Sequence, residues 1–265
     1  MAAPRALLID VDGVLVVSWR PLPGAVDALA AVREQVGVRF LTNTTSHTRA
    51  QLTALLRDAG FDVHQDEVVT VASAVSTYLR RNHAGARCLL LTSGDIAADL
   101  PEVRIVTEPP ADVVLLGGAG EEFSYDALNT ALAAVLDGAA LVAMHRNLVW
   151  RTDAGLQLDT GAYLAGLEAA AGVRATVVGK PEPAMFDAAL ASLGVRPEEC
   201  AMVGDDLDTD VRAAQARGIT GVQVRTGKFR ATQLEDGGPP PHVLLDSFAD
   251  VPRWLREGGW RRGQT

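Results

Sequence analysis

Short apolar runs alternate with longer amphipathic stretches along most of the chain. A short apolar run that ends at turn-forming residues is typical of a buried strand, and apolar residues every three or four positions are typical of a helix that packs one face on a core. These patterns predict strands over residues 6–9, 36–42, 88–92, 113–116, 141–144, 176–178, 201–203, 221–224 and 243–245. They predict helices over residues 23–34, 48–59, 125–136, 162–171, 184–193 and 209–216, and one helix or a helix pair over residues 66–81.

Repeated strand–helix units indicate an α/β fold with a doubly wound parallel sheet and helices on both faces. The units are too many for one regular sheet, so we expect two domains. Residues 1–81 and 179–265 are predicted to form a discontinuous core, and residues 82–178 an inserted α/β domain.

Composition and charge narrow the function. The chain has 265 residues, of which 48% are hydrophobic and 22% charged, as in an ordinary globular protein. A formal charge of −9 argues against general nucleic-acid binding, which needs a basic face. We find no apolar run of membrane-spanning length and no signal peptide, so we expect a cytoplasmic protein without a membrane partner. Cys88 and Cys200 stand in apolar contexts typical of buried free thiols.

Two carboxylates follow the first predicted strand. Its apolar residues end at Asp10, and Asp12 follows two positions later, just before Gly13. Ligands of open α/β sheets collect at the carboxyl ends of strands, and two close carboxylates repel unless a proton or a cation lies between them. Asp-Gly is also an ordinary turn former. The pair alone therefore leaves a purely structural role open.

Two more strand ends carry polar groups. Strand 36–42 ends in Thr42, Asn43 and Thr44, which suit anion binding at a helix N-terminus but also helix capping. Lys180 follows strand 176–178 and precedes a proline, where it could deliver a positive charge to a phosphate or simply be a surface lysine.

Strand 201–203 is followed by Asp205, Asp206, Asp208 and Asp210. A helix dipole favours acids at a helix N-terminus, but four carboxylates are more than a cap needs. Oxygen clusters bind hard divalent cations, and no His or Cys grouping indicates zinc. In a parallel sheet all these strand ends meet at one edge. Carboxylates with Mg²⁺, a lysine and N–H donors would form a site for phosphoryl transfer there.

The order of these motifs resembles the haloacid dehalogenase superfamily of phosphohydrolases. The resemblance rests on Asp-Val-Asp-Gly-Val-Leu at 10–15, Leu-Thr-Asn-Thr at 41–44, Gly-Lys-Pro at 179–181 and Gly-Asp-Asp-Leu-Asp-Thr-Asp at 204–210. The long insert is similar to the C2-type α/β cap of subclass IIA, which includes NagD-type and pyridoxal phosphate phosphatases. Within it, the chain looks most like the phospholysine phosphohistidine inorganic pyrophosphate phosphatases and their relatives, on residues 120–125, 156–161, 177–181 and 223–230.

This resemblance implies a Rossmann-like catalytic core, a cap and a Mg²⁺-dependent phosphatase. Asp10 would be the nucleophile that forms an aspartyl-phosphate, and Asp12 would be the general acid and base. Asp10, the backbone carbonyl of Asp12 and Asp205 would bind Mg²⁺. Asp210 would orient these ligands without binding the metal itself, and Asp206 is assigned the same role less firmly.

The same resemblance assigns the phosphate contacts. Thr42, Asn43 and Thr44 would hold the phosphoryl oxygens, and Lys180 would neutralise the phosphate and hold Asp10. An aspartate at the position of Asp12 favours hydrolysis of a phosphoester or phosphoramidate, because dehalogenating members lack it.

Cap residues should select the leaving group, because the core motifs contact only the phosphoryl end. We expect Arg146 and Asp159 to contact a small phosphorylated substrate. NagD-type caps commonly have Ala-Thr-Asn-Pro-Asp where this chain has Ala-Met-His-Arg-Asn at 143–147, which argues against NagD-like sugar or nucleotide substrates. The insert could also form a homodimer.

Two other functions fit the same motifs. A phosphotransferase or mutase would pass the phosphoryl group to an acceptor alcohol instead of water. A non-catalytic, receiver-like regulatory module also uses an acidic pocket, a threonine and a lysine on a doubly wound sheet. The cap-sized insert argues against the receiver, which is about half as long.

Overall fold

The computed structural model describes residues 3–152 and 155–258, with the backbone alone at 150–152, 155 and 156. The chain forms two compact units. Unit 1 comprises Met1–Thr42, Arg49–Val69 and Met185–Thr265, and unit 2 comprises Asn43–Thr48 and Thr70–Ala184. Unit 2 thus includes residues 43–48, 70–81 and 179–184, which the expected division placed in the core. Within the described ranges, none of the helices has the length and apolar character that a membrane crossing requires.

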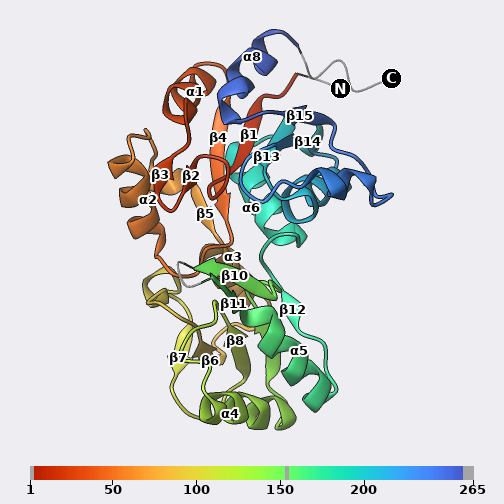
Figure 1. Ribbon diagram of the computed structural model, residues 1–265. Helices are drawn as coiled ribbons and strands as arrows, with labels where there is room; N and C mark the ends of the chain where they lie inside the picture. Colours follow the sequence, from red (N-terminus) through yellow and green to blue (C-terminus); the bar gives the residue numbers. More distant parts are fainter. Residues whose placement is uncertain (1–2, 153–154, 259–265) are drawn as a thin grey trace. The chain divides into compact units, whose positions relative to one another are not determined.

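Unit 1 is built on a sheet with the strand order β15–β14–β13–β1–β4–β5 (Figure 1). The neighbouring pairs from β15 to β4 are all parallel. The strands are β1 (Ala6–Asp10), β4 (Gly37–Thr42), β5 (Val68–Thr70), β13 (Cys200–Gly204), β14 (Thr220–Val224) and β15 (Val243–Leu245). The helices are α1 (Ala25–Arg33), α2 (Arg49–Asp58), α6 (Pro183–Leu193), the π-helix η4 (Leu207–Arg212), α7 (Ala213–Ala216) and α8 (Val251–Arg256).

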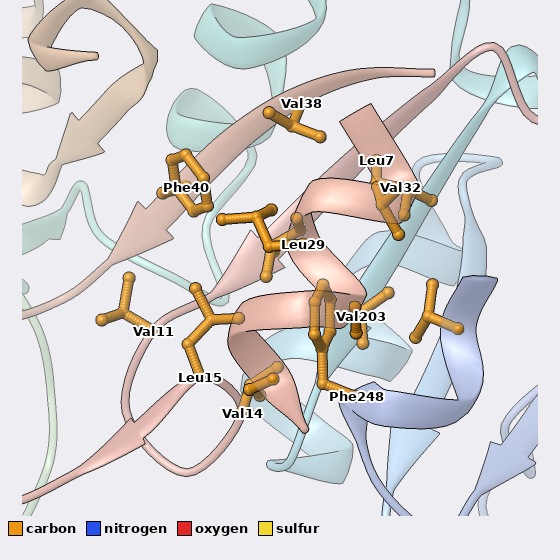
Figure 2. Close-up of a cluster of buried hydrophobic side chains, with 14 of the residues drawn as sticks. Leu7, Val11, Val14, Leu15, Leu29, Val32, Val38, Phe40, Val203 and Phe248 are labelled. Carbon is orange, nitrogen blue, oxygen red and sulfur yellow. The ribbon is translucent and has the colours of Figure 1, made fainter. Parts of the chain in front are cut away.

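Successive side chains of a strand point to opposite faces, so each strand of unit 1 contributes to two layers. Leu7 and Phe40 pack with Leu29 of α1 and with Phe248 in one buried cluster (Figure 2). Arg39 points to the other face, where its Nε donates to a hydroxyl of α6 at 2.9 Å. Helices therefore cover both faces of the sheet, and the predicted doubly wound core is confirmed.

Unit 2 contains a second parallel sheet, with the order β12–β9–β8–β6–β7. Its strands are β6 (Arg87–Leu91), β7 (Arg104–Val106), β8 (Val113–Leu116), β9 (Ala140–Ala143) and β12 (Thr176–Val177). Its helices are α3 (Val71–Asn82), α4 (Tyr125–Leu136) and α5 (Thr160–Ala171). An antiparallel hairpin, β10 (Val149–Thr152) and β11 (Gly155–Leu158), precedes α5.

The core of unit 2 also has two layers. Val114 of β8 packs with Val135 of α4 and Leu164 of α5 in one buried cluster. On the other face, Cys88 of β6 and Leu79 of α3 line a small cavity. Cys88 and Cys200 are buried free thiols, as predicted.

The region predicted as a helix over residues 66–81 forms several elements instead. A 3₁₀ turn, η1 (Gln65–Glu67), leads into β5, and α3 begins only at Val71. Thr70 ends β5 and caps α3, where its Oγ1 accepts from the Ser73 N–H at 3.1 Å. The prediction missed this strand because three residues are too short to show strand periodicity.

Several short elements were not predicted. The hairpin β2 (Val16–Val17) and β3 (Arg20–Pro21) turns at Ser18 and Trp19, which have φ values of 49° and 61°. Strand β7, hairpin β10–β11 and helix α8 were also missed. Four 3₁₀ turns complete the described chain: η2 (Ala97–Asp99), η3 (Pro197–Glu199), η5 (Ala231–Glu235) and η6 (Phe248–Asp250).

Candidate active site

Asp10 and Asp205 leave neighbouring strands at the same edge of the unit 1 sheet. Asp10 is the last residue of β1, and Asp205 follows the last residue of β13. The two strands are parallel and pair Ile9 with Val203, so their register brings the two aspartates together. Asp10, Asp205 and Asp210 are buried, and each offers a carboxylate oxygen within 4.8 Å of the others. We call these three residues the carboxylate cluster.

Two glycines make room for the Asp205 carboxylate. A Cβ at Gly13 would lie 2.1 Å from Asp205 Oδ2, and a Cβ at Gly227 would lie 2.0 Å from the same oxygen. Thr226 Oγ1 donates to the Gly13 carbonyl at 2.5 Å and ties the two glycine loops together. The Lys228 backbone N–H donates to Asp205 Oδ2 at 2.7 Å. These contacts fix the position of the carboxylate.

The π-helix η4 presents the other acids that follow β13. Asp206 caps it, since its Oδ1 accepts from the N–H groups of Asp208 and Thr209 at 3.2 and 3.1 Å. The Asp210 Oδ2 accepts from the Asp206 N–H at 3.3 Å. Gly204 permits this close approach, because a Cβ there would lie 2.3 Å from the Asp210 Cβ. Because one of its oxygens belongs to the carboxylate cluster, Asp210 is a candidate metal ligand, and the supporting role expected for it stays a prediction.

The electrostatics of the carboxylate cluster favour a cation. Burial raises the pKa of Asp205, and the charges of Asp10 and Asp210 raise it further. The buried Asp205 Oδ1 has no hydrogen-bond partner among the residues that the structure describes. A carboxylate oxygen in this position can serve as a metal ligand. Because the donors are all carboxylate oxygens, the cluster fits a hard divalent cation such as Mg²⁺ better than zinc.

Two further predicted residues of unit 1 lie beside these strand ends. Asp12 is exposed, two residues beyond β1, where its backbone forms a bridge with Val16. The parallel pair of Asp10 with Leu41 places Thr42 one position further along the neighbouring strand. Thr42 is buried at the end of β4.

In unit 2 the structure joins two predicted residues that are distant in sequence. Asn43 Oδ1 accepts from the Lys180 N–H at 2.9 Å, and Asn43 Nδ2 donates to the Lys180 carbonyl at 2.8 Å. The Lys180 side chain is buried, and Thr44 is partly buried. That Asn43, Thr44 and Lys180 share one phosphate site with the carboxylate cluster of unit 1 stays a prediction.

Arg146 and Asp159 both make structural contacts within unit 2. The Arg146 guanidinium donates to the two carboxylate oxygens of Glu168 at 2.9 and 2.6 Å. Asp159 is the N-cap of α5, and its Oδ1 accepts from the N–H groups of Thr160 and Ala119 at 2.8 and 3.3 Å. These contacts explain both residues without a ligand, so their role in substrate binding stays a prediction.

Sequence reasoning missed Lys228, which lies in the loop after β14. Its Nζ is 3.8 Å from Asp206 Oδ2. Loss of hydration lowers the pKa of Lys228, but the carboxylates of Asp10, Asp205, Asp206 and Asp210 outweigh this and raise it. Two signals in the sequence could have found this residue: it follows a predicted strand end, as Lys180 does, and the chain contains only these two lysines.

Comparison with known proteins identifies the family. Residues 7–105 match the family described as haloacid dehalogenase-like hydrolase, and residues 177–251 match the related HAD-hydrolase-like family. The human haloacid dehalogenase-like hydrolase domain-containing protein 2 is 40% identical over 252 residues, which cover 94% of this chain and 95% of the relative. The chain belongs to the haloacid dehalogenase-like hydrolase family.

Two further members of this family refine the assignment. The phospholysine phosphohistidine inorganic pyrophosphate phosphatase of Bos taurus is 36% identical over 257 residues, covering 94% of this chain and 92% of the relative. The structure of NagD from E. coli K-12 superposes with a TM-score of 0.85 and 27% identity, covering 94% of this chain and 98% of NagD. The predictions of a HAD-like phosphatase, of subclass IIA and of its fold are confirmed.

Proposed function

We propose that this chain is a Mg²⁺-dependent phosphatase that hydrolyses a small phosphorylated compound through an aspartyl-phosphate on Asp10. One observation carries the proposal: Asp10, Asp205 and Asp210 offer oxygens within 4.8 Å of one another at the carboxyl edge of a parallel sheet. Ligands of open α/β sheets bind at this edge. The family assignment supports the same reading.

The metal-binding residues follow from the donor set. Asp10 and Asp205 would hold Mg²⁺ with their carboxylates and Asp12 with its backbone carbonyl, while Asp206 and Asp210 would orient these ligands. When bound, Mg²⁺ supplies positive charge next to the phosphoryl oxygens.

The reaction would take place in two steps. In the first, an Asp10 oxygen attacks the phosphorus, the bond to the leaving atom breaks, and Asp12 gives that atom a proton. In the second, water attacks the phosphorus of the aspartyl-phosphate while Asp12 takes a proton from it. This releases phosphate and restores the Asp10 carboxylate. The exposure of Asp12 suits a group that must meet both a leaving atom and an incoming water.

The phosphoryl oxygens would be held by hydroxyl and N–H groups of Thr42, Asn43 and Thr44. Lys180 would add a positive charge, because an ammonium group acts as a compact point charge toward phosphate. The pairing of Asn43 with the backbone of Lys180 supports a joint role for these two residues.

The substrate class is a phosphoester, a phosphoramidate or pyrophosphate. The name of the Bos taurus relative states phospholysine, phosphohistidine and inorganic pyrophosphate as its substrates. For this chain, Arg146 and Asp159 would contact the leaving group. A homodimer through unit 2 stays a prediction.

The proposal is tested with p-nitrophenyl phosphate in Mg²⁺ and in EDTA. Asp10→Asn should lower kcat by about a thousandfold or more, because amide nitrogen and oxygen are poor nucleophiles at phosphorus. The control is Asp62→Asn, which removes an exposed carboxylate from the same unit and should keep kcat within about twofold. Turnover that is unchanged in Asp10→Asn would overturn the assignment of the nucleophile.

Two further measurements separate the alternative functions. Acid-quenched peptide mapping should find phosphate on Asp10 during turnover. A receiver-like module would take up phosphate from acetyl phosphate without repeated turnover. A phosphotransferase would yield a phosphorylated acceptor when glycerol is added, whereas a hydrolase releases free phosphate.

A further inference from the structure

The chain carries its positive charge almost entirely on arginine. Of its 24 lysine and arginine residues, only Lys180 and Lys228 are lysines. Lys180 is the cation expected for the phosphate. Lys228, the other lysine, lies beside the acids that follow β13. All the remaining lysine or arginine positions of the chain are arginine.

Several arginines of this chain hold an acid by both of its oxygens. The guanidinium of Arg146 bonds to both oxygens of Glu168 in this way, and that of Arg212 to both oxygens of Asp236. A two-point contact of this kind occupies the carboxylate and leaves little room for a metal ion. An ammonium group is a point charge with no such fork, so it can stand near an acid without covering both oxygens.

The position of Lys228 is fixed by its backbone. Its N–H donates to Asp205 Oδ2 at 2.7 Å, and a Cβ at the preceding Gly227 would touch the same oxygen. The Lys228 side chain is 61% exposed, and its Nζ lies 3.8 Å from Asp206 Oδ2. The ammonium group is thus held close to the acids while it stays outside the buried carboxylate cluster.

We propose that Lys228 is a built-in counter-cation of the acids around the metal site, and that it lowers their affinity for the divalent cation without covering a metal ligand. This inference rests on the proposed function, because it takes the carboxylate cluster as the Mg²⁺ site. Without metal, the ammonium charge reduces repulsion among the carboxylates. When the metal ion is bound, the ion and the Lys228 ammonium group attract the same carboxylates and repel each other. Each therefore weakens the binding of the other to these carboxylates.

The sign of the effect makes this role testable. Lys228→Met should bind Mg²⁺ about three- to tenfold more tightly, because a charge a few ångströms away is removed from a partly solvated site. Metal-free Lys228→Met should unfold at a lower temperature than the wild type. Lys228→Arg should bind Mg²⁺ no more tightly than the wild type, because a guanidinium can bond to both oxygens of Asp206.

The measurement is the Mg²⁺ dissociation constant, from calorimetry and from Mg²⁺-dependent thermal shifts, at low and high KCl. Arg230→Met is the matched control, since it removes an exposed charge two residues away and should leave the constant unchanged. The gain in Lys228→Met should shrink at high KCl. Lys228→Gln, which keeps a polar side chain, serves if the Met variant does not fold.

The outcomes separate this inference from the proposed function. Tighter Mg²⁺ binding in Lys228→Met, absent in Arg230→Met, supports the counter-cation. Mg²⁺ binding that is equal or weaker in Lys228→Met and Lys228→Gln overturns the counter-cation role but leaves the proposed metal site intact. A wild-type protein that does not bind Mg²⁺ overturns both.

Discussion

Replacement of Asp205 by asparagine should stabilise the metal-free protein and remove its response to Mg²⁺. The Asp205 carboxylate is buried, and one of its oxygens lies within 4.8 Å of an oxygen of Asp10 and of an oxygen of Asp210. Burial and these two charges raise the pKa of Asp205. Near neutral pH the Asp205 carboxyl of the metal-free fold is either charged, and repelled by its neighbours, or binds a proton that the unfolded chain does not bind. Either state lowers the free energy of unfolding.

The size of the effect follows from the geometry. Two unit charges 4.8 Å apart repel by about 3 kcal/mol at an effective dielectric constant of about 20. Proton uptake and solvent reduce this penalty, so Asp205→Asn should raise the free energy of unfolding by on the order of 2 kcal/mol. The asparagine keeps an acceptor for the Lys228 N–H. Its amide group can also donate to the carboxylates of Asp10 and Asp210.

The pH dependence of the gain is fixed by the direction of the pKa shift. Because folding raises the pKa of the Asp205 carboxyl, the penalty is absent below the ordinary carboxyl pKa of about 4 and grows as the pH rises toward that of the folded group. The stabilisation by Asp205→Asn should therefore be small near pH 4 and larger near neutral pH.

Thermal unfolding in EDTA and in Mg²⁺ measures both parts of this prediction. In EDTA at neutral pH, Tm should rise by about 4–8 °C in Asp205→Asn. Mg²⁺ should raise the Tm of the wild type but not that of the variant, because a ligand stabilises only the fold that binds it. Asp62→Asn, an exposed change in the same unit, should move neither value. A variant that is less stable than the wild type in EDTA, or that still responds to Mg²⁺, would refute the reasoning.

Two other predictions concern a glycine and an ion pair. Gly13→Ala should cost about 2–4 kcal/mol and weaken Mg²⁺ binding, because its Cβ would lie 2.1 Å from Asp205 Oδ2 at a φ of +82°. Gly85→Ala is the control, because Gly85 has a φ of +73° but open space around it, and its cost in urea unfolding should be only about 1 kcal/mol. Equal losses of unfolding free energy in Gly13→Ala and Gly85→Ala would contradict the steric argument. The Arg146 hydrogen bonds lower the pKa of Glu168 to about 2, so the stability that this pair adds is present above pH of about 4.5 and lost as the pH falls toward about 2. Urea unfolding should therefore show Glu168→Gln well below the wild type at pH 7 and closer to it near pH 3, and a constant gap would contradict this.

The sequence predicted most strands of the two large sheets, because most of them are apolar runs closed by polar residues, but it missed the short strands β5 and β7. Val113–Leu116 and Val243–Leu245 match their predicted bounds, and β1 differs from its prediction by one residue. The hairpins could not be predicted in the same way. Ser18 and Trp19 turn β2 into β3 with positive φ, although neither is the glycine or asparagine that usually signals such a turn.

The residues of the candidate site, predicted or missed, differ in how much of their environment the sequence could indicate. Asp10 and Asp205 stand at strand ends, so the parallel topology alone brings them together. The contacts of Arg146 and Lys228 depend on loops whose course has no periodic signal. Glu168 reaches Arg146 from a helix, and Gly227 lets Lys228 approach Asp205. Such contacts follow from tertiary packing and not from local pattern.

The structure bears on the two explanations that the sequence left open for the acids after β13. Asp206 and Asp208 make contacts expected of acids at a helix N-terminus: Asp206 caps η4, and Asp208 bonds to Arg212 at 2.8 Å. Neither Asp205 nor Asp210 serves as such a cap. Both are buried with Asp10, glycines make room for their carboxylates, and the pKa of Asp205 is raised. Three buried carboxylates that offer oxygens within 4.8 Å of one another repel, and a cation bound between them would offset this repulsion.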